Sequence, residues 1–213
     1  MRPNCPTSFV SPAVLPETRI RNIIMISEFL PLLDEHANMT PYFVDRDFAH
    51  AHGKFHPTAH IWVLKLHPVR ILLQQRAFTK DSYPGQWDMS AAGHVVYKDT
   101  IRNTAIRELR EELGIHAHPH DLKRLGSFVH HTIGVFHGKP WNDRESVHIF
   151  LYIAKEDFIP HWQKEEIETC RWTTPDELQA MLHAANDAPN HEKLCTLEQD
   201  VHILLNYLKN VDL

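Results

Sequence analysis

The pattern of apolar and polar residues predicts short strands interrupted by a few helices. Runs rich in β-branched and other apolar residues predict strands over residues 28–33, 60–64, 71–76, 122–131, 146–154 and 168–173. Apolar residues spaced three and four apart predict helices over residues 100–113, 175–185 and 197–208. Mixed strands and helices of this kind are typical of a single α/β sandwich.

The helix over residues 100–113 is the most clearly delimited element of the pattern. Asp99 or Thr100 can cap its N-terminus, and Gly114 stands where a C-terminal cap is needed. Its apolar stripe consists of Ala105, Ile106, Leu109 and Leu113. The helix is therefore expected to pack one face on the core.

Three glutamates follow one edge of this helix. Residues three and four apart share a helix face, so Glu108, Glu111 and Glu112 converge beside the apolar stripe, at the border of the core. Crowded carboxylates repel one another, and a hard divalent cation offsets that repulsion. Their oxygen ligands suit Mg²⁺, or Mn²⁺ in its place. The pattern thus predicts a metal site facing a cleft.

The alternative is an acidic, solvated helix surface. Arg107 and Arg110 stand among the glutamates and could pair with them on that surface. Two glycines favour a site instead. Gly93, ahead of the helix, lets the backbone approach a bound substrate closely, and Gly114 ends the helix directly after the acidic cluster.

Composition narrows the classes of function. The chain has 213 residues, enough for one well-buried domain, and a formal net charge of -5, which argues against a broad nucleic-acid footprint. No apolar run approaches the roughly 18 residues of a membrane span. The three widely spaced cysteines form neither a disulfide framework nor a zinc knuckle, so we expect a cytoplasmic protein.

The organisation of the chain is also readable from its composition. Residues 1–24 are rich in proline and are expected to form an irregular N-terminal arm. Residues 25–213 are expected to form a single domain that closes with the C-terminal helix. Met25 could be the true start of the protein, which the sequence alone does not decide.

Residues 93–115 resemble the Nudix box, written Gly-x5-Glu-x7-Arg-Glu-U-x-Glu-Glu-x-Gly-U, where U is a bulky aliphatic residue. Every fixed position matches except one, because Asp99 stands where the family has Glu. The resemblance implies a Nudix-type α/β/α sandwich with a mixed sheet. It also implies a small-molecule diphosphate as substrate and a magnesium ion, or manganese, as cofactor.

The same resemblance implies a role for each charged residue of the box. Glu111 and Glu112 would bind metal, and Glu108 would bind metal or act as the general base. Arg107 would orient these carboxylates. Asp99 would pair with Arg107, although its side chain is one methylene shorter than the usual glutamate.

A wider stretch, roughly residues 26–185, resembles the branch of Nudix proteins close to isopentenyl diphosphate isomerase. The isomerase needs a cysteine directly before the box glycine, and Ala92 stands there in this chain. The carbonyl of Ala92 remains similar to a metal ligand in the family. Because a methyl group cannot transfer a proton and the acidic cluster is complete, the sequence favours hydrolysis of a diphosphate linkage in a nucleoside diphosphate derivative or similar compound. Isomerase activity and a non-catalytic, ligand-binding module are the alternatives.

The isomerase also holds a metal with histidines and carboxylates, and this chain has similar residues. His94, His56 and Glu145, which follows Asp143 closely, match ligand positions. Either His50 or His52 could supply a further ligand. The alternative is that these are surface loop residues without a common role.

Other candidate residues lie outside the box. Arg76 and Lys80 could bind substrate phosphates, or could simply be solvated surface cations. Trp62 and Trp87 are expected in the core. Residues 126–143 are candidates to line the pocket, and a homodimer is a further expectation, because dimers are common in the family.

Overall fold

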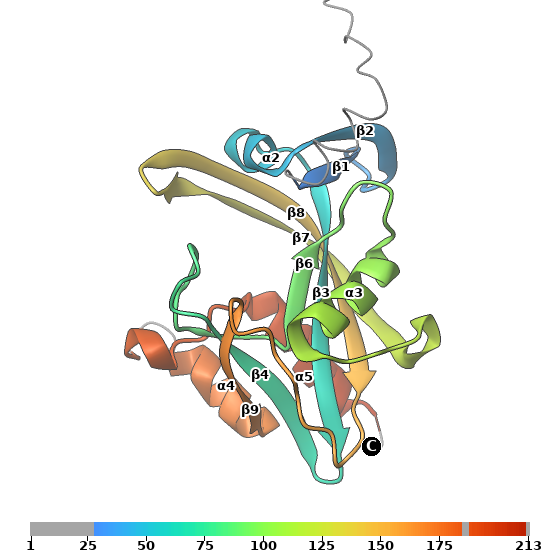
Figure 1. The fold of residues 1–213 in the computed structure, drawn as a ribbon, viewed down its shortest axis with the longest axis vertical. Helices are drawn as coiled ribbons and strands as arrows, with labels where there is room; N and C mark the ends of the chain where they lie inside the picture. The colour runs from blue at the N-terminus through green and yellow to red at the C-terminus, as the bar shows by residue number, and fades with distance from the viewer. Residues whose placement is uncertain (1–27, 185–187, 212–213) are drawn as a thin grey trace, which may run out of the picture.

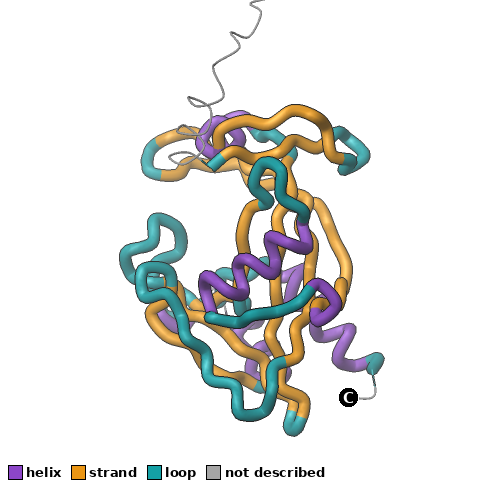
Figure 2. Tube along the Cα trace, turned by 45° about the vertical axis from the view of Figure 1, so that its right-hand side comes forward, coloured by secondary structure: helices purple, strands orange, loops and turns teal. Residues whose placement is uncertain are grey.

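The computed structural model describes residues 28–184 and 188–211. The arm predicted for residues 1–24 and the alternative start at Met25 lie outside the described residues. The elements in chain order are β1 (Phe29–Leu33), β2 (Met39–Asp45), α2 (Arg46–His52), β3 (His56–Leu66), β4 (Val69–Arg76), β5 (Trp87–Asp88), β6 (Ala91–His94), α3 (Ile101–Leu113), η1 (Pro119–Asp121), β7 (Leu122–Phe136), β8 (Lys139–Ile153), β9 (Ile167–Thr173), α4 (Pro175–Ala184), η2 (Asn190–Glu192) and α5 (Glu198–Lys209). Figures 1 and 2 show their arrangement.

Seven strands form the main sheet, in the order β5-β4-β3-β8-β7, with β6 paired to β3 and β9 paired to β4. β3 and β8 run parallel, whereas the other pairs are antiparallel, so the sheet is mixed as expected. β3 pairs with β6 near its start, over 58–61, and with β4 near its end, over 64–66. Different neighbours at its two ends let β3 join both parts of the sheet (Figure 1).

Two hydrophobic cores cover opposite faces of this sheet. On one face, Ile61 and Val63 of β3 pack in a cluster with Leu109 of α3. On the other face, Trp62 and Leu64 of β3 pack in a cluster with residues of α4 and α5, including Leu178, Val201 and Leu204. Each fully buried aliphatic side chain contributes about 1.5–3 kcal/mol relative to an exposed one, which holds the layers together. The predicted α/β/α sandwich is confirmed.

Helix α3 begins and ends as its sequence predicts. Thr100 is the N-cap, and its hydroxyl accepts a hydrogen bond from the backbone N–H of Asn103 at 3.2 Å. Gly114 adopts a left-handed conformation with φ of 69° and donates its N–H to the carbonyl of Arg110. These two caps fix the phase of the helix and thereby the direction of its glutamates.

Several boundaries differ from the sequence prediction. The hairpin of β7 and β8 extends to Phe136 and Lys139, well beyond the predicted ends at residues 131 and 146. The strand predicted over 60–64 begins at His56. β2 and α2 were not predicted at all. β2, α2 and the far part of the hairpin lack a clear apolar period. The hairpin projects from the body and is held by backbone pairing between its own two strands (Figure 1).

A buried ion pair joins β3 to the C-terminal helix. Nδ1 of His60 lies 3.0 Å from Oδ2 of Asp200, which is fully buried. Burial alone would lower the pKa of His60, but Asp200 outweighs it and raises that pKa from 6.5 to about 9. The pair therefore stabilises the fold fully below pH 6.5, and this contribution is lost as the pH rises through about 9.

This pair makes the free energy of unfolding depend on pH. We expect wild-type stability to fall by roughly 3 kcal/mol between pH 6 and pH 10 through this group, because one pKa unit corresponds to about 1.4 kcal/mol. The variant Asp200→Asn should lose most of that dependence, since a neutral amide does not favour the charged imidazole. Urea unfolding at the two pH values measures both. An equal pH dependence in the two proteins would contradict the assignment to His60.

Candidate active site and metal centre

The three box glutamates lie in different surroundings. Glu108 is buried, with 9% of its surface exposed. Glu112 is half-buried, and its Oε2 accepts a hydrogen bond from Nε2 of Gln74 on β4 at 3.1 Å. Glu111 is exposed and contacts two arginines on the helix surface. The helix thus turns Glu108 and Glu112 inward and leaves Glu111 at the rim.

Burial gives the two inner carboxylates unusual proton affinities. It raises the pKa of Glu108 to about 7, against the opposing charge of Arg107. It raises the pKa of Glu112 well above its ordinary value, and the charges of Glu108 and Asp88 add to the rise. Two inward-facing, mutually repelling carboxylates need either protons or a cation. Their oxygen donors fit a hard divalent ion such as Mg²⁺.

Arg107 connects the glutamates to the sheet. Its Nη1 lies 2.8 Å from Oε1 of Glu108 and 3.1 Å from Oε2 of Glu111, and its Nη2 donates to the carbonyl of His94 at 3.2 Å. Asp99 comes within 3.9 Å of Nε, which has no hydrogen-bond partner. Asp99 instead accepts hydrogen bonds from the start of helix α3, from the backbone N–H of Thr100 and from the hydroxyl of Thr104. The shorter side chain therefore gives an ion pair with Arg107 but no hydrogen bond.

Gly93 of β6 packs directly against the carboxylate of Glu108. A Cβ built at this position would overlap the Glu108 side chain, including Oε1 and Cδ. The preference for glycine comes from this close approach and not from the backbone, because the φ of Gly93 is not positive. Ala92 precedes Gly93 in the same strand, and the role of its carbonyl as a ligand stays a prediction.

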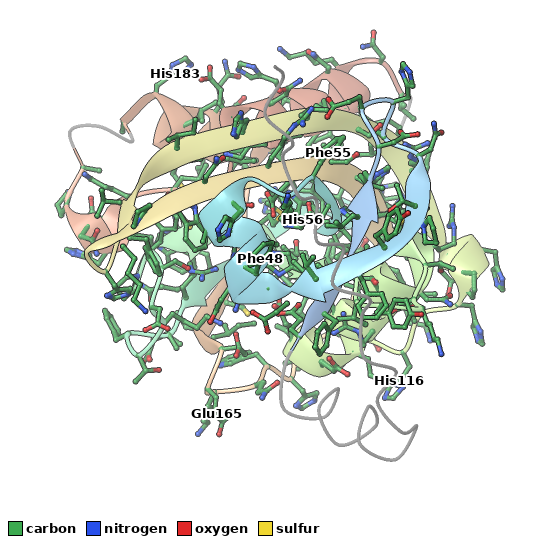
Figure 3. The ribbon with its side chains drawn as sticks, turned by 90° about the horizontal axis from the view of Figure 1, so that it is seen from above. Phe48, Phe55, His56, His116, Glu165 and His183 are labelled. Carbon is green, nitrogen blue, oxygen red and sulfur yellow. The ribbon has the colours of Figure 1, made fainter. Side chains whose placement is uncertain are left out.

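Next to the glutamates of the box, three histidines and two carboxylates come together. The ligand atoms of His50, His56 and His94 all lie within 4.8 Å of one another, and those of His56, Asp143 and Glu145 do likewise. Nε2 of His56 is 3.7 Å from Asp143 and 3.8 Å from Glu145, and Nε2 of His94 is 3.7 Å from Glu145. Figure 3 shows His56 between α2 and the hairpin of β7 and β8. We call these five residues the histidine cluster.

The fold explains how residues so far apart in sequence meet. β3 and β8 pair in parallel with His56 opposite Glu145, and β6 brings His94 beside β3. Helix α2 buries His50, whereas His52 stacks on Phe48 and bonds the carbonyl of that residue. Of the two histidines that the sequence left open, His50 is therefore the one in the cluster.

Two buried polar atoms in the histidine cluster have no hydrogen-bond partner within the described residues. Nδ1 of His56 contacts the carbonyl of Lys54 at 2.7 Å, which fixes the ring and directs Nε2 into the cluster. Nε2 of His56 and Oδ1 of Asp143 are both buried without a hydrogen-bond partner. Buried polar atoms are nearly always satisfied in native proteins, so these two fit metal ligands.

Charge in the histidine cluster also suits a cation. Burial lowers the pKa of His50 to about 3 and also lowers that of His56, so both rings are neutral and can donate an electron pair. Burial and the neighbouring Glu145 raise the pKa of Asp143 to about 7. A bound cation would reverse this rise, because it favours the charged carboxylate.

Glu28 links the glutamates of the box to the histidine cluster, and the sequence alone did not identify it. Its Oε1 lies 3.4 Å from Nδ1 of His94, and its Oε2 lies 3.4 Å from Nε of Arg46. Its charge also acts on Glu108. Nothing in the local pattern indicates this role, because Glu28 simply precedes a strand far from the box in sequence.

The cations predicted to bind phosphate already have partners. Arg76 donates to Asp88 at 3.2 Å and to Ser82 at 2.9 Å, and Lys80 pairs with Glu166. Within the described residues, neither side chain forms an ion pair with a box glutamate or with a residue of the histidine cluster. Trp62 and Trp87 are buried, as expected. The role of Arg76 and Lys80 in substrate binding stays a prediction.

A comparison with family models decides the family, because residues 54–195 match the model described as the NUDIX domain. The chain belongs to the Nudix family. Within the described residues, no helix is both long and apolar enough to cross a membrane.

Similar proteins agree with the suspected branch of the Nudix family. Nudix hydrolase 3 of Arabidopsis thaliana is 32% identical over 167 residues, which are 77% of this chain but only 21% of that protein. An uncharacterized Nudix hydrolase of Clostridium acetobutylicum is 30% identical, over 88% of this chain and 90% of its own length. Isopentenyl-diphosphate Delta-isomerase of Nocardia farcinica is 32% identical over 54% of this chain and 62% of its own. A Deinococcus radiodurans crystal structure shares the fold, with a TM-score of 0.57, 20% identity and coverage of 74% and 90%.

Proposed function

We propose that this Nudix protein hydrolyses a diphosphate linkage in a nucleoside diphosphate derivative or a similar small compound. The observation that carries the proposal is the pair of inward-facing carboxylates of α3, the buried Glu108 held by Arg107 and the half-buried Glu112 held by Gln74. A module that only binds a ligand has little need of charges so costly to bury. Mg²⁺, or Mn²⁺, would be held by Glu111 and Glu112, with Glu108 as a third ligand or as the base.

Each residue of the box has a distinct part in this proposal. When bound, the metal ion would supply charge neutralisation at the phosphates and a more acidic water. Glu108 is the candidate base, because its raised pKa lets it hold a proton near neutral pH. Arg107 fixes the direction of the Glu108 carboxylate, and Gly93 leaves room for it. Glu111, at the exposed rim, would complete the metal site from the solvent side.

The direct test is a metal-dependent hydrolysis screen over diphosphate compounds. We expect phosphate-containing products from at least one nucleoside diphosphate derivative in the presence of Mg²⁺, and none after chelation with EDTA. Tight binding of one compound with no turnover of any would overturn the enzyme proposal and favour the binding module.

We also propose that the histidine cluster holds a second divalent cation. Its imidazole and carboxylate donors suit Zn²⁺, Mn²⁺ or Co²⁺ better than Mg²⁺. We expect the wild-type protein to bind Co²⁺ with a visible absorption band, and His56→Gln to weaken that binding at least about 10-fold, since one ligand is lost. His52→Gln is the matched control, because this histidine lies on the same helix as His50 but outside the cluster. Equal Co²⁺ affinity in all three proteins would exclude the site.

The isomerase is the second candidate function, and the histidine cluster is the observation that favours it. Against it stands Ala92, whose methyl group cannot accept or donate a proton. We expect no allylic product from isopentenyl diphosphate in a deuterium-exchange assay. Detection of that product would reverse the order of the two candidates.

A further inference from the structure

The face of the hairpin that carries Asp143 and Glu145 continues towards the hairpin tip. Side chains alternate along a strand, so Trp141 of β8 lies on the same face as these two carboxylates. Residues paired across antiparallel strands share a face, and Trp141 pairs with Gly134 of β7. Phe136, two residues after Gly134, lies on that face as well. The face that contributes to the histidine cluster therefore also carries two aromatic rings.

Trp141 lies directly beside the histidine cluster. Its ring centroid is 4.5 Å from that of His50, and Nε2 of His50 is 3.3 Å from Nε2 of His94. The ring of Phe136 lies 5.0 Å from that of Trp141, with an angle of 52° between the two planes. The carbonyl of His94 accepts the hydrogen bond from Arg107 of the box. The rings thus form a row that starts at the two candidate metal sites and runs towards the hairpin tip.

The far end of this row approaches a loop next to the box. Nε2 of His137, at the hairpin tip, lies 3.9 Å from Oδ1 of Asp81 in the loop between β4 and β5. In Figure 1 the hairpin and this loop project on the same side of the molecule. Lys80 of the same loop pairs with Glu166, whose charge acts on Glu112. The two aromatic rings therefore lie between the histidine cluster and a loop whose ion-pair partner is close to a box glutamate.

Gly134 leaves open space beside Trp141. A Cβ built at Gly134 would meet no atom of the described residues within 4 Å, although Trp141 is its partner across the hairpin. The φ of Gly134 is not positive, so the backbone does not require glycine at this position. Trp141 and Phe136 are only half-buried. A half-exposed indole next to bare backbone offers a surface on which a flat ring can stack.

We propose that Trp141, with the open space over Gly134, binds the planar base of a nucleoside diphosphate compound by stacking. This inference rests on the proposed function for the diphosphate part of the ligand, and it goes further by assigning the residues that recognise the base. Stacking on an aromatic side chain suits any base, because every base has a π-face. The phosphates would then extend from Trp141 towards the metal sites.

The openness of this surface favours a base over an aliphatic chain. Gly134 is exposed, and the exposed polar residues Thr132 and Lys139 lie on the same face, one on each side of it. A base can stack one face and keep its polar edge in water. An aliphatic chain binds well only where apolar side chains enclose it and remove it from water.

The test compares ADP with inorganic pyrophosphate, because only ADP carries a base. We expect Trp141→Ala to raise the dissociation constant of ADP with Mg²⁺ about 10- to 100-fold in calorimetry, as for one lost stacking contact, and that of pyrophosphate by less than about twofold. Trp141→Phe keeps a ring and should lose less affinity for ADP than Trp141→Ala. Ile133→Ala is the matched control, because this exposed apolar residue lies on the opposite face of β7 and should not affect ADP binding.

A second variant tests the same surface without removing a ring. In Gly134→Val the new side chain fills the open space, and valine is favoured in strands, so this protein should fold even if Trp141→Ala does not. We expect Gly134→Val to weaken ADP binding and to leave pyrophosphate binding and Co²⁺ binding at the histidine cluster unchanged. ADP should also quench the tryptophan fluorescence of the wild type, and Trp141→Phe should remove that quenching.

The outcomes separate this inference from the proposed function. Wild-type ADP affinity in Gly134→Val, equal losses of ADP and pyrophosphate binding, or binding of isopentenyl diphosphate without binding of ADP would each overturn the inference. Hydrolysis of a nucleoside diphosphate derivative with the same KM in wild type and Gly134→Val would also overturn it and leave the proposed function standing. ADP binding that depends on Trp141, with no hydrolysis of any compound, would instead overturn the proposed function and support this inference.

Discussion

Replacing Glu112 with Gln is expected to lower the rate of diphosphate hydrolysis by about 10²- to 10⁴-fold. Gln keeps the size of the side chain and can still bond Gln74, but it removes the charge that would hold the metal ion. The loss should be mainly in kcat and should not recover at high Mg²⁺ concentration. Steady-state hydrolysis of the substrate found in the screen, with phosphate release as readout, measures it.

The matched control for this variant is Glu165→Gln. Glu165 is also a glutamate, but it is exposed and lies at the edge of the molecule in Figure 3. Its replacement removes the same charge and should leave activity within about twofold of wild type, because exposed charges contribute little. If Glu112→Gln and Glu165→Gln retain equal activity, Glu112 has no part in the reaction.

Stability gives a second readout for the same variant. In the metal-free protein, Glu108 and Asp88 repel the charge of Glu112, so Glu112→Gln should be at least as stable as wild type at pH 8. A ligand that binds only the folded state raises its melting temperature. Mg²⁺ should therefore stabilise the wild type more than the variant in a thermal scan. The variant would then be inactive because of its chemistry and not because of its fold.

The sequence predicted helix α3 well because the determinants of that segment are local. Thr100 and Gly114 fix the two ends of α3, and the helical period then directs Glu108 and Glu112 inward. The α/β/α sandwich followed from the same kind of periodic pattern, and both cores confirm it. Local capping and periodicity need no knowledge of the rest of the chain.

The histidine cluster depends on long-range placement, which the sequence left open. Whether His50 or His52 points inward is set by the phase of α2, a helix that was not predicted. The pairing of His56 with Glu145 is set by the register between β3 and β8, almost ninety residues apart. Glu28 and Gln74 join the site only through the tertiary fold, so no spacing rule could have found them.

The same limitation affects Arg76 and Lys80. Their basic side chains made them candidates for phosphate, but the fold supplies Asp88 and Glu166 as partners from other strands and loops. The buried pair of His60 and Asp200 also gave no signal in the sequence, because it forms only where α5 packs against β3.

Replacing Gly93 with Ala is expected to lower hydrolysis by at least about 10²-fold and to destabilise the fold by about 1–3 kcal/mol. The added methyl group would overlap the carboxylate of Glu108, whose Oε1 is also held by Arg107 at 2.8 Å. The substitution therefore displaces the candidate base or pushes β6 away from α3. Either result changes the position of the Glu108 carboxylate relative to β6, on which the proposed chemistry depends. Kinetic assays and urea unfolding of the same preparation measure the two effects together.

A second glycine of the sheet makes this test specific. Gly126 of β7 also has an ordinary φ, but a Cβ added there would meet only Ile203, at 3.7 Å and beyond. Gly126→Ala should thus keep activity and change the free energy of unfolding by less than about 1 kcal/mol, since the methyl group makes ordinary contacts. If Gly93→Ala is as active as Gly126→Ala, the close approach of β6 to Glu108 is not needed for catalysis. If both lose activity equally, the effect belongs to the sheet and not to the carboxylate.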